Sequence, residues 1–352
     1  MPTITDALDI IGKLTKADQN QLKTMLLASN SAGDADMETF LTQKRTTNGQ
    51  VCPCCGSVHS VRNGHRKDGR QRYLCRDCGK SYVITTNSIA SGTRKPLATW
   101  KRFVECMIAA LPLREAAAIC GIHRNTAFFW RHKILDALQN MANEVVLSGI
   151  VEADETFFAV SYKGNHKKSL TFAMPRPAHK RGHAEHIRGI SHEKVCVPCA
   201  VNRGGLSIAR AITLGRISTK DLHRAYDGRI TEGTTLVTDK HSSYTRFAKS
   251  NNINLIQLKG GKVKKGLFHI QHINNYHSRL KKFIERFNGV STKYLDNYLI
   301  WHNFVNYAKE TSTEKASILL SFALSTLKHE TCMGVSVRAS APISDIIYRA
   351  AC

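Results

Sequence analysis

The segments Leu147-Ser-Gly-Ile-Val-Glu-Ala-Asp154 and Thr235-Leu-Val-Thr-Asp239 each place an aspartate at the end of a short, apolar, β-prone run. Both runs predict buried strands. A carboxylate at the end of a buried strand is held rigidly and faces outward, as a site for divalent cations requires. If the two strands lie side by side, Asp154 and Asp239 can hold the same Mg²⁺ or Mn²⁺ ions. An aspartate after a strand is also a common helix N-cap or turn residue, so the rest of the chain must decide between these interpretations.

The composition predicts a modular protein with a polyanionic partner. A chain of 352 residues is too long for one ordinary core and suggests two or three domains. Lys and Arg number 51 against 27 acidic residues, which gives a net charge of +24 and a pI of about 9.8. Nucleic acid is the expected partner of such a charge. The sequence shows no basic amphipathic helix, long apolar span or secretory leader, so we expect a cytoplasmic protein without a membrane partner.

Two Cys-x-x-Cys pairs predict a zinc ribbon. They lie in Val51-Cys-Pro-Cys-Cys-Gly56 and in Cys75-Arg-Asp-Cys-Gly79, and the glycine that follows each pair permits a tight turn around a metal. In a reducing compartment such pairs indicate metal binding rather than disulfides. Cys54 could replace its neighbour as a ligand, but only the assignment without it keeps the two-residue gap and the following glycine. The four thiolates expected to bind one structural Zn²⁺ are Cys52, Cys55, Cys75 and Cys78.

The stretch between the two cysteine pairs is basic and predicts a hairpin with positively charged edges. Such side chains are suited to contact the phosphates of a nucleic acid backbone, although a run of charge is often only a solvated face. The candidates are Arg62, His65, Arg66, Lys67, Arg70 and Arg72.

Residues 97–135 predict a helix-turn-helix. A helix opens at Leu97, a short alanine-rich helix over 113–119 stops near a glycine, and another helix begins after Ile122. The small alanines allow the two later helices to cross closely. The last helix would present basic and polar residues to the major groove of double-stranded DNA, namely Arg124, Asn125, Thr126 and Arg131. The alternative is a helical subdomain that only packs.

The remaining part of the chain alternates strand-like and helix-like segments. The predicted order begins with a strand at 147–154 and a hairpin of two strands at 194–201 and 206–212. A helix at 218–226, the strand ending at Asp239, a strand at 253–258 and a long helix at 271–287 follow. This is the order of an RNase H-like fold. The predicted fold class is therefore α/β, with a mixed sheet and flanking helices, preceded by a zinc ribbon and a helical region. Cys196-Val-Pro-Cys199 lies inside an apolar strand and is not expected to bind metal.

The predicted domain organisation has five parts. They are a helical lead-in at 1–45, the zinc ribbon at 46–90, the helix-turn-helix region at 91–145, the RNase H-like domain at 146–307 and a helical C-terminal tail at 308–352. An exposed basic loop is expected over 163–188. The tail carries no predicted role.

Taken together, these features resemble bacterial insertion-sequence transposases, and the group most similar is the zinc-ribbon transposases of the insertion sequence 1595 family. The resemblance covers residues 45–307. Besides the cysteine pairs and the helix-turn-helix, it is carried by 151–156, 237–239, 269–281, 287–289 and 294–299. It implies an RNase H-like domain of the DDE type that cleaves DNA at transposon ends and transfers the 3′-hydroxyl to a target with two Mg²⁺ or Mn²⁺ ions. It also implies a nucleoid-associated protein that acts on DNA as a homodimer or larger homo-oligomer.

The third metal ligand departs from the pattern of that family. The family motif His-x-Asn-x-x-Glu aligns with His272 and Asn274, and this register places His277 where the glutamate is expected. An imidazole nitrogen can bind Mn²⁺ or Mg²⁺ with less charge than a carboxylate, so the resemblance implies a site made by Asp154, Asp239 and His277. Glu285, about two turns further along the helix, is the rival ligand.

Several alternatives stay open at this stage. Family members often carry a basic residue after the third ligand, but Ile284 takes that position, so Lys281 or Lys282 is expected to serve. Strand alternation puts Glu152 on the same face as the first aspartate, as a possible alternate ligand, and Glu155 on the opposite face. Other functions to test are a non-catalytic zinc-ribbon and helix-turn-helix regulator, and a structure-selective nuclease.

Overall fold

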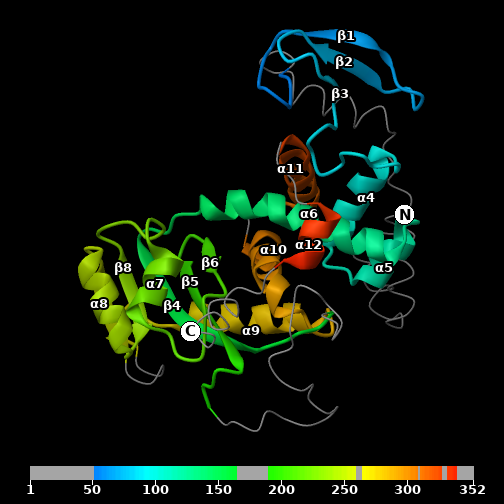
Figure 1. Cartoon of the computed structure of the whole chain (residues 1–352). Coiled ribbons are helices and arrows are strands. Elements are labelled where there is room, and N and C mark those ends of the chain that lie inside the picture. The colour runs from blue at the N-terminus through cyan, green and yellow to red at the C-terminus, as the bar shows by residue number, and fades with distance from the viewer. Residues whose placement is uncertain (1–50, 165–188, 259–263, 308–309, 327–330, 339–352) are drawn as a thin grey trace, which may run out of the picture. The chain divides into compact units, whose positions relative to one another are not determined.

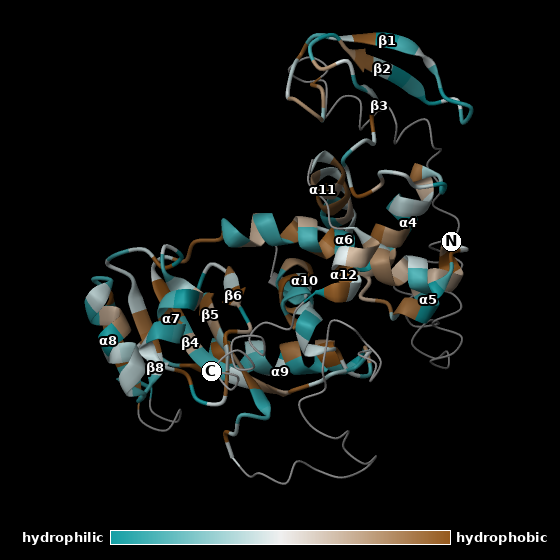
Figure 2. Ribbon diagram, viewed as in Figure 1, coloured by the Kyte–Doolittle hydropathy of each residue, from teal (hydrophilic) through white to brown (hydrophobic). Residues whose placement is uncertain are grey.

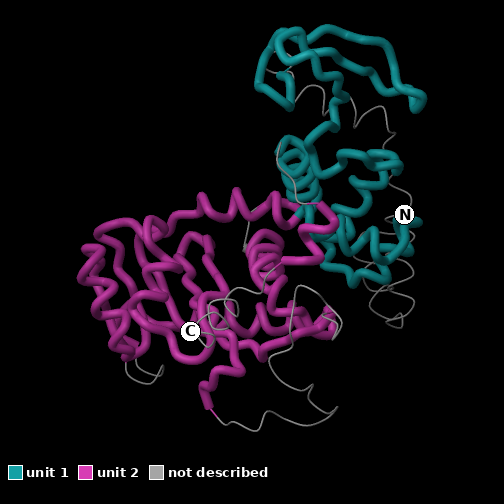
Figure 3. The backbone as a smooth tube through the Cα atoms, in the orientation of Figure 1, with its two compact units in different colours: residues 1–134, 312–329 teal, residues 135–311, 330–352 magenta. Residues whose placement is uncertain are grey.

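A computed structural model of the chain describes residues 51–164, 189–258, 264–307, 310–326 and 331–338 (Figure 1). The predicted lead-in at 1–45 and most of the predicted basic loop lie outside the described residues. The chain divides into two compact units (Figure 3). Unit 1 comprises residues 1–134 and 312–329, and unit 2 comprises residues 135–311 and 330–352.

Unit 1 contains a small antiparallel sheet of three strands, β1 (Ser60–His65), β2 (Gln71–Cys75) and β3 (Ser81–Val83), in the order β1-β2-β3. Tyr73 and Tyr82 pair across β2 and β3, and their rings stack with 5.6 Å between centroids. The buried cluster of this sheet consists of these two tyrosines with Cys52 and Cys75. So few apolar side chains cannot stabilise a sheet alone, which leaves a role for a metal.

Helices α4 (Leu97–Ile108), α5 (Leu113–Ile119), α6 (Arg124–Asn143) and α11 (Ser312–Ser325) follow the predicted pattern. α6 begins in unit 1 and crosses into unit 2. Trp130 of α6 stacks on Trp100 of α4, with 3.7 Å between ring centroids, and Ala116 and Ala117 of α5 are buried. Gly121 takes a φ of 58° in the turn between α5 and α6, a left-handed conformation that favours glycine. Both helices of the predicted helix-turn-helix are therefore present.

Unit 2 is built on a mixed sheet. Its strands are β4 (Ile150–Ala159), β5 (Lys194–Asn202), β6 (Ser207–Ala209), β7 (Thr213–Leu214), β8 (Thr235–Asp239) and β9 (Asn254–Leu258). They lie in the order β6-β5-β4-β8-β9, and β7 also pairs with β5. β4, β5 and β6 are antiparallel neighbours, whereas β8 and β9 run parallel to β4. This strand order is that of an RNase H-like fold, as the sequence predicts.

Helices cover both faces of this sheet. α7 (Thr219–Tyr226) and α8 (Ser242–Ser250) contribute Leu222 and Phe247 to a core that also contains Val151 and Ala153 of β4. α9 (Gln271–Glu285) contacts β4 and β5, and α10 (Leu295–Tyr307) contacts β6. Figure 2 shows apolar residues along β4 and β5 and many polar residues on α7. The short elements η2 (Thr292–Tyr294) and α12 (Cys332–Val337) complete the unit.

One predicted strand end is wrong. β4 does not stop at Asp154 but continues to Ala159, because β5 pairs with it along its whole length, from Val151↔Asn202 to Ala159↔Lys194. A half-buried carboxylate is tolerated in the middle of this strand because the registered pairing of β4 with β8 ends two residues earlier, at Glu152↔Val237. Cys196 and Cys199 are buried in β5, as expected for apolar strand residues. Among the described residues, no helix is long and apolar enough to cross a membrane.

Candidate functional site

Asp154 and Asp239 lie on neighbouring parallel strands. The last registered pair of β4 and β8 is Glu152↔Val237, and each aspartate follows two residues later on its strand. β8 ends at Asp239, whereas β4 continues. The two carboxylates are close enough that the negative charge of Asp239 contributes to a raised pKa of Asp154. The structure thus brings together the two aspartates that the sequence singles out.

Helix α9 adds His277 to this pair. Nδ1 of His277 lies 3.8 Å from Oδ2 of Asp154, and the two side chains are 12% and 24% exposed. Within the described part of the chain, Nε2 of His277 and Oδ1 of Asp239 are buried without a hydrogen-bond partner. Buried polar atoms usually have a partner, and a bound cation would supply one here. The donor set of two carboxylates and one imidazole suits Mg²⁺ or Mn²⁺.

Burial shifts the pKa values of the ionisable groups in this cluster toward their neutral forms. Burial raises the pKa of Asp154 to about 7, with a further contribution from the neighbouring Glu155. Burial also raises the pKa of Glu155 to about 7. It lowers the pKa of His277 to about 4, and the positive charge of Lys281 adds to this effect. Each group therefore disfavours its charged form, and a divalent cation would stabilise the carboxylates.

Glu155 lies on the opposite side of β4 from Asp154. Its Oε1 accepts a hydrogen bond of 2.6 Å from the hydroxyl of Tyr244 in α8. Asp154 and Glu152, by contrast, contact residues of α9. The alternation expected from the sequence is confirmed, and the side chain of Glu155 contacts α8 on the opposite face of the sheet.

The other candidates on α9 differ in position. Glu285 is exposed in the last turn, eight residues and about 12 Å along the helix axis from His277. Lys281 is exposed one turn after His277, and its charge acts on both His277 and Asp154. Lys282 is also exposed, and Ile284 is buried. The histidine, rather than Glu285, is the α9 residue beside the aspartates.

A second polar cluster lies on the same face of the sheet, and only its arginine has no local sequence signal. It joins Glu152 of β4, Arg203 of the β5–β6 turn, and His269 and His272 at the start of α9. Arg203 was not a candidate because nothing but its place in a glycine-rich turn distinguishes it.

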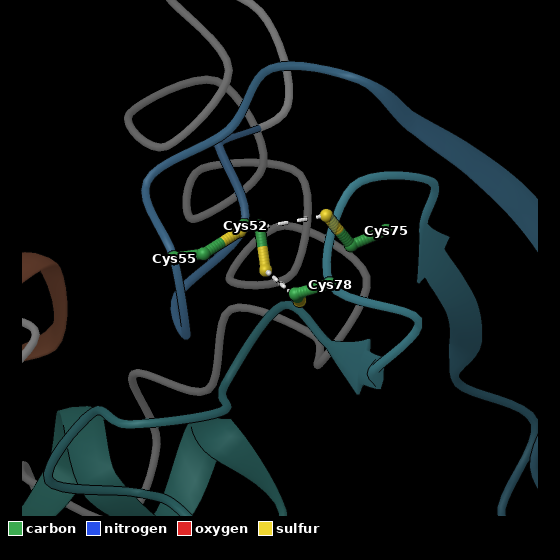
Figure 4. A group of neighbouring side chains, drawn as sticks. All are labelled: Cys52, Cys55, Cys75 and Cys78. Atoms are coloured by element: carbon green, nitrogen blue, oxygen red, sulfur yellow. Dashed lines mark hydrogen bonds between the residues drawn. The ribbon is translucent and has the colours of Figure 1, made fainter.

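The zinc centre is formed by the four predicted cysteines (Figure 4). The Sγ atoms of Cys52 and Cys78 are 3.7 Å apart, and those of Cys55 and Cys75 are 3.6 Å apart. These separations match the edge of a tetrahedron with Zn–S bonds of about 2.3 Å. The four residues therefore fit one structural zinc ion.

The two halves of the zinc centre share one backbone pattern. Gly56 donates its N–H to the carbonyl of Cys52, and Gly79 does the same to Cys75, at 2.9 and 3.1 Å. Hydrogen bonds from the N–H groups of Cys78 and Asp77 are the main causes that lower the pKa of Cys75 to about 6, which favours the thiolate that zinc requires.

Cys54 is not a ligand in this arrangement. Its side chain is exposed and its N–H donates to Sγ of Cys52 at 3.4 Å. The choice of Cys55 over Cys54 made from the sequence is confirmed by the geometry of the cluster.

The predicted DNA contacts of the ribbon are exposed side chains on and beside β1 and β2. They are Arg62, His65, Arg66, Lys67 and Arg72, and Arg70 is half-buried. The guanidinium of Arg72 donates to the carbonyl of Asn63 at 3.0 Å, and Arg66 lies 3.8 Å from Asp68. Most of these charges face solvent and are free to meet a polyanion.

The predicted contacts of α6 divide into two groups. Arg124 and Asn125 are exposed in its first turn, and Thr126 is half-buried. Arg131, however, is only 1% exposed and donates from Nη2 to the carbonyl of Leu111 at 2.7 Å. Its prediction as a DNA contact is wrong, because this part of α6 lies beneath the segment that joins α4 and α5.

Two segments of the chain match families of known proteins. Residues 146–304 match the ISXO2-like transposase domain, and residues 33–81 match the transposase zinc-ribbon domain. The chain therefore carries regions similar to both domains of such transposases. The first match contains Asp154, Asp239 and His277, and the second contains all four zinc-binding cysteines.

The chain is also similar to a protein described as an uncharacterized protein in the transposable element ISH50 of Halobacterium salinarum. The two are 25% identical over 268 residues, which cover 74% of this chain and 86% of the relative. The match extends over most of both proteins.

Two crystal structures show a weak likeness to this chain. The Mos1 strand transfer complex is 11% identical with a TM-score of 0.26, over 68% of this chain and 78% of that chain. The pre-cleavage Mos1 transpososome is 10% identical with a TM-score of 0.21, over 62% and 77%. The fold assignment rests on the strand order of unit 2 and not on these two structures.

Proposed function

We propose that this protein is an ISXO2-like transposase, which cleaves DNA at transposon ends and joins the freed 3′-hydroxyl to target DNA. Asp154, Asp239 and His277 would hold two Mg²⁺ or Mn²⁺ ions. When bound, the ions activate the attacking hydroxyl and stabilise the departing oxygen. The observation that carries this proposal is the buried cluster of two strand carboxylates and one helix imidazole with two unpartnered ligand atoms.

The chain's own residues would mainly orient the ions and exclude other charges. Asp154 is fixed by the N–H of Glu155, which donates to its Oδ1 at 2.9 Å, so Oδ2 is the atom turned toward His277. The low pKa of His277 keeps its imidazole neutral at neutral pH and leaves a lone pair for a metal. A nitrogen donor favours Mn²⁺ over Mg²⁺ relative to a third carboxylate. Lys281 would lie within reach of a DNA phosphate beside the metal site.

DNA binding would be shared between the two units. The net charge of +24 favours association with DNA, and the exposed basic residues of the ribbon and of the first turn of α6 are the proposed contacts with transposon ends. Lys281 and Lys282 are proposed contacts near the cleavage site. We infer that the protein acts as a homodimer or larger homo-oligomer, because two transposon ends must be joined, and that it lies with the chromosomal DNA of its host.

The test compares full-length wild type with Asp154→Ala and Asp239→Ala on DNA that carries the inverted repeats flanking the gene. Both variants should bind the ends as wild type does and lose Mn²⁺-dependent cleavage by at least about 100-fold. Asp227→Ala is a matched control, since this aspartate is 53% exposed and pairs only with His223 among the contacts described. Cleavage that persists in both variants would overturn the proposal.

The same assay separates the other functions. A non-catalytic regulator predicts end binding with no cleavage by wild type under any metal. A structure-selective nuclease predicts cleavage of branched DNA without any joined product. Joined product from wild type and none from Asp154→Ala would exclude both.

A further inference from the structure

Glu152 is a buried carboxylate that receives the start of helix α9. It is 1% exposed, and its Oε2 accepts hydrogen bonds from the backbone N–H groups of His272 and Ile273 at 2.8 and 3.1 Å. These N–H groups belong to the first turn of α9, where a helix leaves its donors unpaired and carries partial positive charge. A carboxylate from the sheet thus caps the helix.

Arg203 contacts the other carboxylate oxygen of Glu152. Its Nη2 lies 2.9 Å from Oε1 of Glu152 and donates to the carbonyl of Leu267 at 3.0 Å. Its Nη1 lies 2.7 Å from Nε2 of His272 and 3.1 Å from Nε2 of His269. Because a guanidinium can only donate, Nε2 of each imidazole is the acceptor in these contacts. One side chain therefore joins the β5–β6 turn, the segment before α9 and the first turn of α9.

This cluster could instead be taken for a metal site. The ligand atoms of Glu152, His269 and His272 lie within 4.8 Å of one another. Arg203, however, already places a positive charge against all three. Oε2 of Glu152 is also occupied by two N–H groups. Oε1 of Glu152 makes no hydrogen bond, but the guanidinium 2.9 Å away supplies the positive charge that a metal would otherwise bring.

The segment that follows α9 is hydrogen-bonded to the residues that follow β4. Beyond β4, the N–H of Ser161 donates to Oγ1 of Thr292, and the N–H of Thr292 donates to the carbonyl of Ser161, both at 2.8 Å. Nζ of Lys163 donates to the carbonyls of Asn288 and Gly289 at 2.7 and 3.1 Å. β4 and its extension therefore hold α9 at both ends, and His277 lies between the two anchors.

The spacing links the first anchor to the proposed metal site. Glu152 precedes Asp154 by two residues on one face of β4, and His272 precedes His277 by five residues, or about 7.5 Å along the helix. We propose that Glu152 and Arg203 are positioning residues that fix the first turn of α9 and thereby hold His277 against Asp154. The inference rests on the proposed function for the role of His277, but the anchor itself can be tested without metal.

The first measurement is hydrogen exchange of the metal-free full-length protein. In Glu152→Gln and Arg203→Lys, the amides of residues 271–277 should exchange about tenfold faster than in wild type, because the cap loses its charge or its several contacts. Glu232→Gln, the same substitution at an exposed position, should leave exchange unchanged. Lys163→Ala, at the other anchor, should speed exchange after residue 285 and spare the first turn.

The second measurement is Mn²⁺ affinity, followed by electron paramagnetic resonance of free Mn²⁺. Glu152→Gln and Arg203→Lys should weaken binding about tenfold, as is usual for residues that orient metal ligands, whereas Glu232→Gln should not. Arg203→Lys keeps the positive charge, so it also serves if Glu152→Gln fails to fold. Unchanged exchange over 271–277 in the folded variants overturns the inference. Loss of one bound Mn²⁺ in His269→Ala overturns it too, since the cluster would then be a metal site.

The outcome for the proposed function is read separately. If Asp154→Ala binds Mn²⁺ as wild type does, the proposed metal site has failed, while the exchange data still decide whether Glu152 and Arg203 anchor α9. If Asp154→Ala abolishes binding and Glu152→Gln does not weaken it, the metal site stands and the positioning role falls.

Discussion

Nδ1 of His277 faces Oδ2 of Asp154 at 3.8 Å, yet the two do not form an ordinary ion pair. Burial lowers the pKa of His277 to about 4 and raises that of Asp154 to about 7. At neutral pH the imidazole is therefore neutral, and the carboxyl is only partly ionised. Two lone-pair donors held in this way are suited to share a cation, and the following predictions depend on that arrangement.

Replacement of His277 should act on metal use more than on folding. His277→Ala should reduce Mn²⁺-dependent cleavage at least about 100-fold, because one of three ligands is lost. His277→Glu should keep activity and shift the preference toward Mg²⁺, since a carboxylate is a harder ligand than an imidazole. The measurement is cleavage rate against the concentration of each ion. Full activity in His277→Ala, or loss of activity only in Glu285→Ala, would assign the third ligand elsewhere.

The metal-free protein should lose stability as pH rises through the range set by Asp154. Its folded pKa of about 7 lies above the ordinary aspartate pKa of 3.8, so between these values the folded state binds more protons than the unfolded state. Stability is then present at low pH and lost toward pH 7, by on the order of a few kcal/mol. Asp154→Asn removes the titrating carboxyl and with it this pH-dependent contribution to stability. With the zinc site filled and no Mg²⁺ or Mn²⁺ added, the melting temperature of wild type should fall relative to that of Asp154→Asn from pH 5 to pH 8.

Added Mn²⁺ provides the control for that experiment. At pH 8 it should raise the melting temperature of wild type, because a ligand that binds only the folded state stabilises it, and it should not raise that of Asp154→Asn. A wild-type protein that gains stability over the variant between pH 5 and pH 8 without metal would contradict the raised pKa of Asp154.

Removal of zinc should unfold the ribbon. Its buried cluster holds little besides two tyrosines and cysteines, so binding of the metal supplies most of its folding free energy. Cys75→Ser, or a strong chelator, should abolish the near-ultraviolet circular dichroism of the stacked Tyr73 and Tyr82 and weaken DNA binding. Cys54→Ser, in the same loop but exposed, should have no effect. Equal loss in Cys54→Ser and Cys55→Ser would show that the ligand assignment is wrong.

Two arginines on α6 should behave in opposite ways. Arg124→Ala should leave stability unchanged and lower the slope of log affinity against log salt by about 0.9 if it contacts one phosphate. Arg131→Ala should leave the slope unchanged and destabilise unit 1 by about 1–3 kcal/mol, because the buried carbonyl of Leu111 loses its donor. Thermal denaturation and salt titrations of DNA binding measure both effects. A reversal of these outcomes would place the DNA contact further along the helix.

Local sequence patterns were sufficient for the parts of the structure that depend on local periodicity or spacing. The apolar runs predicted the strands that carry Asp154 and Asp239, and the glycine after each cysteine pair predicted the turns around the zinc centre. The helical register that starts at His272 predicted that His277 would lie on α9. In each case the physical cause, alternation, turn geometry or helical repeat, acts over a few residues.

Other features depend on contacts between segments that are far apart in sequence, and no local sequence pattern predicts them. β4 continues past Asp154 because β5 pairs with it. The strand propensities of the residues in β4 alone do not predict this pairing. Arg131 is buried because the α4–α5 segment lies over it, although its sequence context is that of a recognition helix. Arg203 meets Glu152 only after the sheet and α9 are assembled.

The cysteine cluster lies wholly in unit 1 and the aspartate cluster wholly in unit 2. The two proposed metal sites therefore use different residues and different ligand chemistry. In a host short of zinc, the proposed cutting centre would be intact but DNA recognition would be weakened. A host short of manganese or magnesium would contain a protein that occupies transposon ends without cutting them. The frequency of transposition would then depend on two separate ion supplies, and each could limit it alone.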